Sequence, residues 1–173
     1  MHPFLRSSRT LFAPDETQAV VNISELFAEH SRYVWRLSLR LLGSQCDADD
    51  ALQDVFLAAT TGLKRVHDAT KVRAWLRTIT VRTCQRRLRW RSFRRRSHAE
   101  FSDMAGVGRD LEAAHALADA IAQLPVNERV VWTLRHLEEL ELVEVAEAAG
   151  CSLATAKRRL SRARARLQRR LGK

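Results

Sequence analysis

Apolar residues recur at intervals of three and four along almost the whole chain, and no segment alternates apolar with polar side chains. This spacing places the apolar residues on one face of an α-helix, whereas a half-buried strand requires alternation. Glycine and proline interrupt helices, and they number only six and three among 173 residues. The sequence therefore predicts an all-α fold.

The first half of the chain predicts four helices after a tail over residues 1–22. A short helix should span 24–30, and a second should end at Gly43, because glycine readily takes the left-handed conformation that closes a helix. We expect Asp47 to cap the third, which should bury Ala51, Leu52, Val55 and Ala58. A long basic helix should run from Lys71 to about Trp90, and its apolar stripe comprises Val72, Leu76, Ile79, Thr83 and Trp90.

The second half follows a change in composition. Residues 92–110 are polar, hold two of the six glycines and lack periodicity, so we expect a flexible linker between small helical domains at 23–91 and 111–173. In the second domain a helix should begin near Pro125 and pack Val130, Val131, Leu134 and Leu137.

Charge is abundant and segregated. There are 30 Lys and Arg against 20 Asp and Glu, a net charge of +10, which predicts a polyanionic partner such as nucleic acid. Basic residues gather at 71–96 and in the last helix, while acids gather at 47–54 and 138–147. This segregation predicts two nucleic-acid faces and a separate acidic face.

Several classes of protein are disfavoured. No run approaches the ~20 apolar residues of a membrane span, and the first residues lack the apolar run of a secretory signal, so we expect a cytoplasmic protein. The single, scattered Cys46, Cys84 and Cys151 supply no zinc motif, and we expect no metal or cofactor. A nuclease or recombinase would need carboxylates or a nucleophile among basic residues. The acids lie in separate segments and Tyr33 lies in a core helix, so we expect no enzyme.

The segment "VEVAEAAGCSLATAKRRL", residues 143–160, has the pattern of a helix-turn-helix. Ala146 is small where the helices cross, Gly150 permits the turn, and Ser152 can cap the final helix. At ~100° per residue one stripe of that helix is apolar: Leu153, Ala156, Leu160, Ala163 and Leu167.

The opposite side of this helix would face DNA. Arg158 and Arg162 can bond guanine bidentately, whereas Lys157 and Arg159 suit phosphates. The DNA-binding candidates are Ser152, Thr155, Lys157, Arg158, Arg159, Ser161 and Arg162. The later arginines are expected to give general attraction to DNA.

Three segments in order resemble the extracytoplasmic-function (ECF) group of bacterial RNA polymerase sigma factors, in the sigma-70 family. They are "LLGSQCDADDALQDVFLAA", "VRAWLRTITVRTCQRRLR" and the segment from Leu117 to Leu167 that contains the helix-turn-helix. Together they cover about residues 23–172.

The resemblance implies a subunit that binds core RNA polymerase and reads the −35 and −10 promoter elements while assisting melting. Asp47, Asp49, Asp50, Gln53 and Asp54 would bind the clamp coiled coil, and the flap would be a second polymerase contact. The −10 candidates are Arg73, Trp75, Arg77, Arg82, Arg86 and Arg87. A cognate anti-sigma protein is a further expected partner, and no small-molecule substrate is expected.

Departures and alternatives remain at this stage. Arg82 stands where the family often has a base-reading asparagine, which leaves the −10 preference open, and Glu141 should be a weaker cap than the usual Ser or Thr. Trp75 fits a core anchor better than a stacking platform. The acidic stretch could also be merely a solvated face. The rival function is a stand-alone helix-turn-helix repressor or activator, which would leave the acidic helix without a role.

Overall fold

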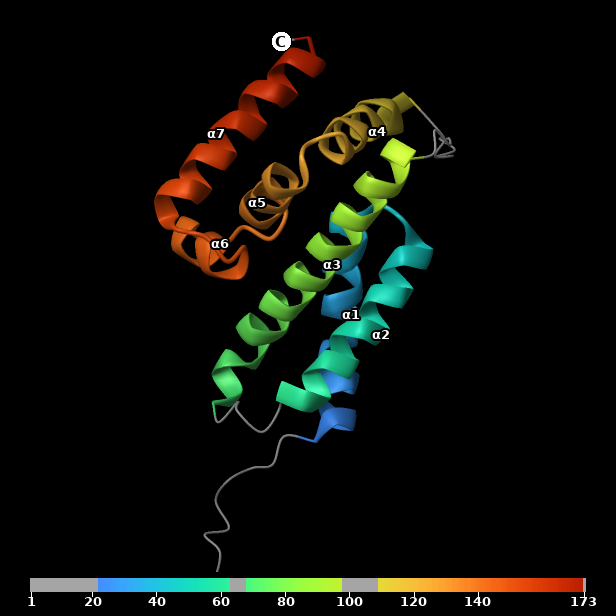
Figure 1. Ribbon diagram of the computed structural model, residues 1–173, viewed down its shortest axis with the longest axis vertical. Coiled ribbons are helices and arrows are strands. Elements are labelled where there is room, and N and C mark those ends of the chain that lie inside the picture. Colours follow the sequence, from blue (N-terminus) through green and yellow to red (C-terminus); the bar gives the residue numbers. More distant parts are fainter. Residues whose placement is uncertain (1–21, 63–67, 98–108, 173) are drawn as a thin grey trace, which may run out of the picture.

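The computed structural model describes residues 22–62, 68–97 and 109–172, and these form helices and turns without a strand (Figure 1). The all-α prediction is confirmed. The helices are α1 (Ile23–Leu42), α2 (Gln45–Gly62), the 3-10 turn η2 (Ala69–Lys71), α3 (Val72–Ser97), α4 (Arg109–Ala122), α5 (Val126–His136), α6 (Leu142–Ala148) and α7 (Leu153–Arg170). The expected tail up to residue 21 and residues 98–108 of the expected linker lie outside the described residues.

The first helix is continuous, so the prediction of two separate helices is wrong. No glycine or proline interrupts Ile23–Leu42, and the side-chain oxygen of Asn22 accepts a hydrogen bond from the Ser24 N–H at 3.0 Å. The predicted end is confirmed: Gly43 has φ 73°, and its N–H donates to the Leu39 carbonyl at 2.8 Å.

The start of α2 differs from the prediction. The Ser44 hydroxyl accepts a hydrogen bond from the Asp47 N–H at 3.3 Å, so Ser44 rather than Asp47 takes the capping position. Ala51 and Val55 are buried as expected, but Ala58 is exposed and Ala59 is buried in its place. Asp47 is thereby free to pair with another helix.

The buried face of α3 shifts along the helix. Val72 and Leu76 are buried as predicted, whereas Trp90 is 63 % exposed and its assignment to the stripe is wrong. Cys84 and Leu88 are buried instead at that end. The face rotates because Val72 and Leu76 pack in a cluster with α1 and α2, whereas Val81, Cys84 and Leu88 pack in a cluster that also includes α5 and α6.

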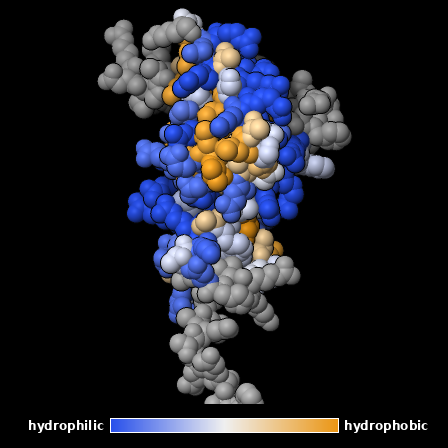
Figure 2. Space-filling view, turned by 90° about the vertical axis from the view of Figure 1, so that its left-hand side faces the viewer, coloured by the Kyte–Doolittle hydropathy of each residue, from blue (hydrophilic) through white to orange (hydrophobic). Residues whose placement is uncertain are grey.

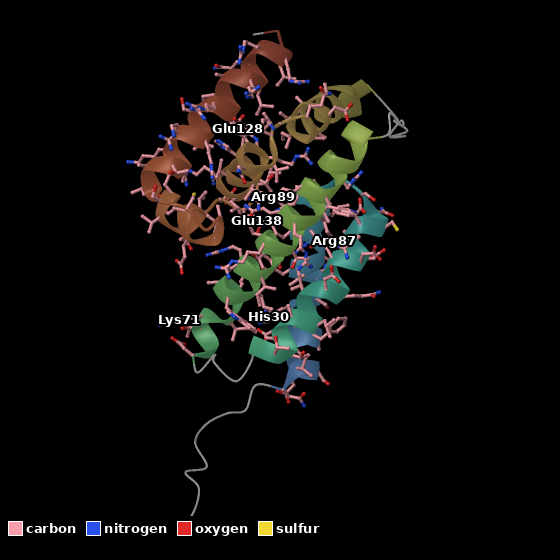
Figure 3. All side chains as sticks on the ribbon, viewed as in Figure 1. His30, Lys71, Arg87, Arg89, Glu128 and Glu138 are labelled. Atoms are coloured by element: carbon pink, nitrogen blue, oxygen red, sulfur yellow. The ribbon has the colours of Figure 1, made fainter. Side chains whose placement is uncertain are left out.

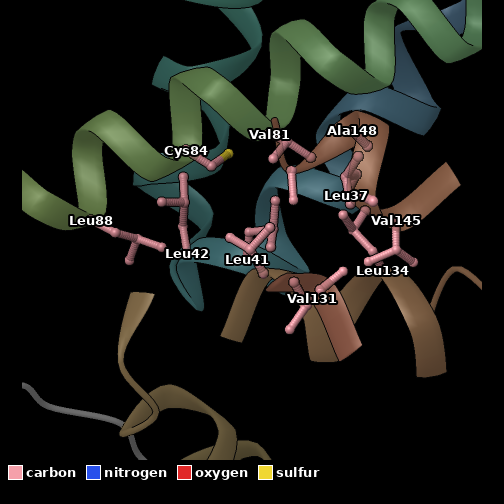
Figure 4. Close-up of a cluster of buried hydrophobic side chains, with 14 of the residues drawn as sticks. Leu37, Leu41, Leu42, Val81, Cys84, Leu88, Val131, Leu134, Val145 and Ala148 are labelled. Carbon is pink, nitrogen blue, oxygen red and sulfur yellow. The ribbon is translucent and has the colours of Figure 1, made fainter. Parts of the chain in front are cut away.

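Three apolar clusters hold the described part of the fold together; the smallest joins the end of α4 to α7, and the other two involve α1, α2 and α3. One, which we call the α1–α3 cluster, lies within α1, α2 and α3 and includes Leu26, Val55 and Leu76. The other joins α1, α2 and α3 to α5, α6 and α7, and we call it the shared core (Figure 4). Its residues are Leu37, Leu41, Leu42, Ala51, Val81, Cys84, Leu88, Val130, Val131, Leu134, Val145, Ala146, Ala148, Ala149 and Ala156. The C-terminal helices therefore pack directly on the N-terminal ones.

The turn between α5 and α6 contains an unusual backbone conformation. Glu139 has φ 57°, the left-handed region that a side chain disfavours. This conformation lets the Leu140 N–H reach the Leu134 carbonyl at 3.1 Å, which closes α5. Leu137, which was expected to pack, is 39 % exposed because it lies in this turn beyond the last residue of α5.

Candidate nucleic-acid and polymerase interface

Helices α6 and α7 form the predicted helix-turn-helix. Gly150 has φ 60°, and the Cys151 N–H donates to the Ala146 carbonyl at 2.9 Å. Ser152 caps α7 as predicted, accepting a hydrogen bond from the Thr155 N–H at 3.2 Å. At the start of α6, a Glu144 carboxylate oxygen accepts the Glu141 N–H at 3.0 Å, which compensates for the weak cap expected at Glu141.

The sides of α7 divide largely as expected. Ala156, Ala163 and Leu167 are buried and Leu160 is half-buried, but Leu153 is 39 % exposed, because it occupies the first position of the helix. Of the DNA-binding candidates, Ser152, Lys157, Arg158, Ser161 and Arg162 are exposed, and Thr155 and Arg159 are half-buried. Arg158 donates to the Thr155 hydroxyl at 3.4 Å, so the two side chains lie side by side at the start of the helix.

The end of α7 is attached to the rest of the domain. Arg166 lies 2.9 Å from the buried carboxylate of Glu128 in α5, and Arg170 bonds to Gln123, just after α4. Arg169 donates to the carbonyl of Ala165 in its own helix, at 3.2 Å. The later arginines therefore include two that hold α7 in place, a role that the sequence pattern did not reveal.

The side of the molecule on which α6 and α7 lie carries an apolar area among hydrophilic residues (Figure 2). On these two helices Val143 is 65 % exposed and Leu153 39 %. Exposed aliphatic side chains gathered on one side of a protein are candidates for contact with another protein.

Helices α2 and α3 bring two predicted sites together. Arg87 donates to one oxygen of Asp54 from Nε at 3.1 Å and from Nη2 at 2.7 Å, and its Nη1 lies 3.4 Å from Asp50 (Figure 3). Arg86 lies 3.6 Å from Asp54. Arg91 contacts Asp47 at 2.5 Å. The expectation that the acids lie apart from the basic segments is therefore wrong, because the fold places these helices in contact.

Arg87 is the centre of this ion-pair network. Burial lowers the pKa of its guanidinium, but hydrogen bonds to Asp54 and Asp50 and their charges outweigh burial and raise the pKa above its usual value. The other candidates on α2 point outward: Asp49 and Gln53 are exposed, and Asp49 accepts a hydrogen bond from the Trp35 indole at 2.7 Å.

The −10 candidates on α3 occupy three kinds of environment. Arg73, Arg82 and Arg86 are exposed, and the Arg73 guanidinium lies 4.4 Å from the centre of the Tyr33 ring. Trp75 is half-buried against the α1–α3 cluster, as expected of a core anchor. Its ring would lie 2.9 Å from a Cβ added at Gly62. Arg77 is buried and lies 3.3 Å from Glu144 of α6.

Leu57 is a candidate for a protein contact that was not among the residues predicted from the sequence. It is 69 % exposed and follows Gln53 by one helical turn, on the outward side of α2. The signal was available in the sequence, because a helical wheel puts this leucine among the acidic residues rather than with Val55.

The capped helix-turn-helix and the second basic helix are typical of a DNA-binding protein. The acidic helix beside them is typical of a surface that binds a protein partner. Residues 26–94 match Sigma-70 region 2, and residues 114–167 match Sigma-70 region 4. The chain is 33 % identical over 172 residues to the ECF RNA polymerase sigma factor SigM of Mycobacterium tuberculosis, an alignment that covers 96 % of this chain and 86 % of SigM. It is 29 % identical over 136 residues to the RNA polymerase sigma factor SigV of Bacillus subtilis, covering 78 % and 82 % of the two chains.

The chain belongs to the ECF group of the sigma-70 family of RNA polymerase sigma factors. Its fold resembles the structure of CnrH in complex with the cytosolic domain of CnrY, with a TM-score of 0.60, 26 % identity and coverage of 87 % of each chain. It also resembles the sigma factor RpoE of Bartonella quintana, solved with the anti-sigma factor NepR. That match has a TM-score of 0.66, 21 % identity and coverage of 86 % of this chain and 96 % of RpoE.

The protein is accordingly a sigma factor, which directs promoter-specific transcription initiation. A stand-alone repressor or activator is not favoured, because the region 2 match accounts for the helices that such a protein would leave without a role. Sigma factors as a class are not enzymes. None of the helices in the described part of the chain is long and apolar enough to cross a membrane.

Proposed function

We propose that α2 binds core RNA polymerase, that α3 engages the −10 element, and that the first half of α7 reads the −35 element. The observation that carries this division is the start of α7. A helix capped by Ser152 and anchored by Ala156 presents the exposed Arg158 and Arg162 away from the protein. This is the arrangement by which a recognition helix enters the major groove.

The polymerase contact that we propose is the outward side of α2. Asp49, Asp50 and Gln53 are exposed there, and Asp47 and Asp54 lie at its edge. Leu57, 69 % exposed, would add an apolar anchor to this polar surface. Acidic residues around an apolar side chain would suit a basic partner surface such as the clamp coiled coil. The exposed Val143 and Leu153 are candidates for a second polymerase contact, with the flap.

The −10 contact would rely on the exposed arginines of α3. Arg82 and Arg86 lie on one side, one helical turn apart, and Arg73 lies further toward the start of the helix. A cationic groove is what separated strands require. Arg77 is buried beneath α6 and paired with Glu144. It could join the exposed arginines in contacting DNA only after Glu144 moves away.

Three further assignments belong to this proposal. The protein would act in the cytoplasm, where the chromosome and the polymerase are, and it would have no catalytic activity of its own. The structure of RpoE was solved with an anti-sigma factor. By this likeness we propose an anti-sigma protein as a partner of this chain.

Transcription reconstituted with core polymerase tests the proposal. The wild-type protein should support initiation that core enzyme alone does not support, on promoters with defined −35 and −10 elements. Initiation that is no better with the protein than without it would reject the assignment.

The polymerase surface has its own test. Leu57→Ser should weaken binding to core polymerase without lowering the melting temperature, because the side chain is 69 % exposed. Leu171→Ser is the matched control, since this leucine is also exposed (40 %) but lies just after the last residue of α7. Equal affinities of the wild type and Leu57→Ser for core polymerase would show that Leu57 is not part of the polymerase-binding surface.

A further inference from the structure

We propose that Glu128 of α5 withholds Arg166 of α7 from DNA, and that this ion pair limits the DNA contact of α7 to the first half of the helix. The inference rests on the proposed function, because it assumes that α7 reads the −35 element. It gives a buried carboxylate outside the predicted site residues a role in DNA selectivity.

Arg166 lies on the same side of α7 as the two arginines that we propose to read bases. It follows Arg162 by four residues and Arg158 by eight, so the three side chains form one row along the helix. All three residues are exposed, and the side chain of Arg166 is 48 % exposed. Its position alone would make Arg166 a third DNA contact.

Glu128 holds this third arginine. Its Oε2 atom lies 2.9 Å from the Nε atom of Arg166, and its side chain is only 9 % exposed (Figure 3). Apart from this ion pair, the oxygen has no hydrogen-bond partner among the described residues. The buried carboxylate therefore depends on Arg166 as its counterion.

The ion pair outweighs a contact between Arg166 and a phosphate. Removing one partner of a buried ion pair is strongly unfavourable, because the other charge stays buried without a counterion. A single phosphate contact on duplex DNA changes affinity by only about 3.5-fold between 50 and 200 mM salt. Arg166 therefore stays on Glu128 when α7 binds DNA.

The position of α7 does not depend on this ion pair alone. Ala163 and Leu167 lie on either side of Arg166 in the sequence, and both are buried in a cluster with Ile121 and Leu124. This apolar contact would remain if Glu128 were replaced by an apolar residue. Such a replacement should release the Arg166 side chain without moving the helix.

A released Arg166 would favour binding without base reading. Arg158 and Arg162 select a sequence by placing the start of α7 in the major groove. A phosphate contact from a later turn carries no sequence information. Three arginines in a row could hold α7 along the backbone of any duplex, so Glu128 favours the −35 element over other DNA.

DNA binding by full-length Glu128→Met at several salt concentrations tests the proposal. Methionine is flexible, suits a buried site and offers no carboxylate to Arg166. On a scrambled −35 duplex, the slope of log affinity against log salt should steepen by about 0.9, the contribution of one phosphate contact. Between 200 and 50 mM salt, the variant should gain about 3.5-fold more affinity for this duplex than the wild type gains. A duplex with the −35 element should gain less.

Two further variants serve as controls. Glu128→Met with Arg166→Gln should restore the wild-type slope, because the released arginine is gone. The matched control Glu138→Met makes the same charge change at a side chain that is also 9 % exposed, but its partner Arg40 lies on α1. It should bind both duplexes like the wild type. Circular dichroism should give the wild-type helix content for each variant, and a Glu128→Met protein that loses helix is replaced by Glu128→Gln.

A wild-type slope for Glu128→Met on the scrambled duplex, or an equal gain on both duplexes, would overturn the proposal. Arg158→Ala in the same assay separates this proposal from the proposed function. Equal losses of Arg158→Ala on both duplexes would reject base reading by α7. A loss on the −35 duplex alone, together with wild-type behaviour of Glu128→Met, would reject only the role of Glu128.

Discussion

The two basic helices differ in what their arginines already contact. On α3, Arg77, Arg86, Arg87 and Arg91 all lie within ion-pair distance of a carboxylate. On the first half of α7, Lys157, Arg158 and Arg162 are exposed, and no carboxylate among the described residues pairs with them. One helix is partly neutralised by its own protein, whereas the other presents its charge to solvent.

This difference in ion pairing indicates that the two basic helices are suited to different roles. The start of α7 is already capped by Ser152 and exposes its basic side chains, so the proposed −35 contact would need no rearrangement of this helix. Much of the charge on α3 is paired with acids of α2 and α6. If α3 engages the −10 element as proposed, full engagement would require those acids to move or to find another partner, and the −10 contact would be the step controlled by rearrangement.

The largest expected effect tests whether the two halves fold together. Leu134→Ala removes a fully buried side chain from the shared core and should lower the free energy of unfolding by about 2–5 kcal/mol. Urea unfolding followed by circular dichroism should remain one transition at a lower midpoint. The matched variant Leu76→Ala lies in the α1–α3 cluster and should have a similar cost. Two separate transitions, one unchanged from the wild type, would show that the halves are independent.

The next effect concerns the exposed side of α7. Arg158→Ala or Arg162→Ala should weaken binding at particular −35 bases by ~1–3 kcal/mol. Arg169→Ala should weaken binding to all DNA sequences alike, because this arginine lies in the last turn of α7, far from the start of the helix, and donates to the Ala165 carbonyl. Fluorescence anisotropy with matched and scrambled duplexes measures the difference. Equal losses on both duplexes would rule out base reading by Arg158 and Arg162.

A smaller effect distinguishes two neighbouring arginines of α3. Arg87→Ala should lower stability by about 1 kcal/mol, because its half-buried guanidinium bridges Asp54 and Asp50. Arg86→Ala should change stability by less than about 0.5 kcal/mol, since its side chain is 73 % exposed, but it should weaken binding to −10 DNA. Thermal unfolding measures both variants. A stability loss at Arg86 as large as that at Arg87 would contradict the division between a structural and an exposed arginine.

The smallest effect lies in the turn between α5 and α6. Glu139→Gly should raise stability by up to about 1 kcal/mol, because glycine tolerates the φ of 57° that glutamate takes there. Glu139→Val should instead lower the melting temperature. No difference between these two variants would mean that the turn does not require its left-handed residue.

The sequence predicted the local features of the fold better than the long-range ones. Gly43, Gly150 and Ser152 were correctly assigned because helix ends depend on the conformation and capping chemistry of one residue. Trp90 was misassigned because periodicity identifies an apolar stripe but not the point at which the neighbouring helices change.

The same limit applies to the candidate sites. The exposed arginines at the start of α7 follow from helical geometry, so a wheel predicts them. The pairing of Arg87 with Asp54 joins residues 33 positions apart, and that of Arg77 with Glu144 joins residues 67 apart. Such contacts depend on how helices pack, which residue spacing does not encode.

Mapping transcription start sites after overexpression of the protein tests the central claim most directly, namely that α3 and α7 serve two elements of one promoter. We predict new start sites preceded by a −10 and a −35 motif at constant spacing. In the double variant Arg158→Ala with Arg162→Ala, the start sites should no longer depend on the −35 motif. A single palindromic motif at variable distance from the new start sites would contradict the account.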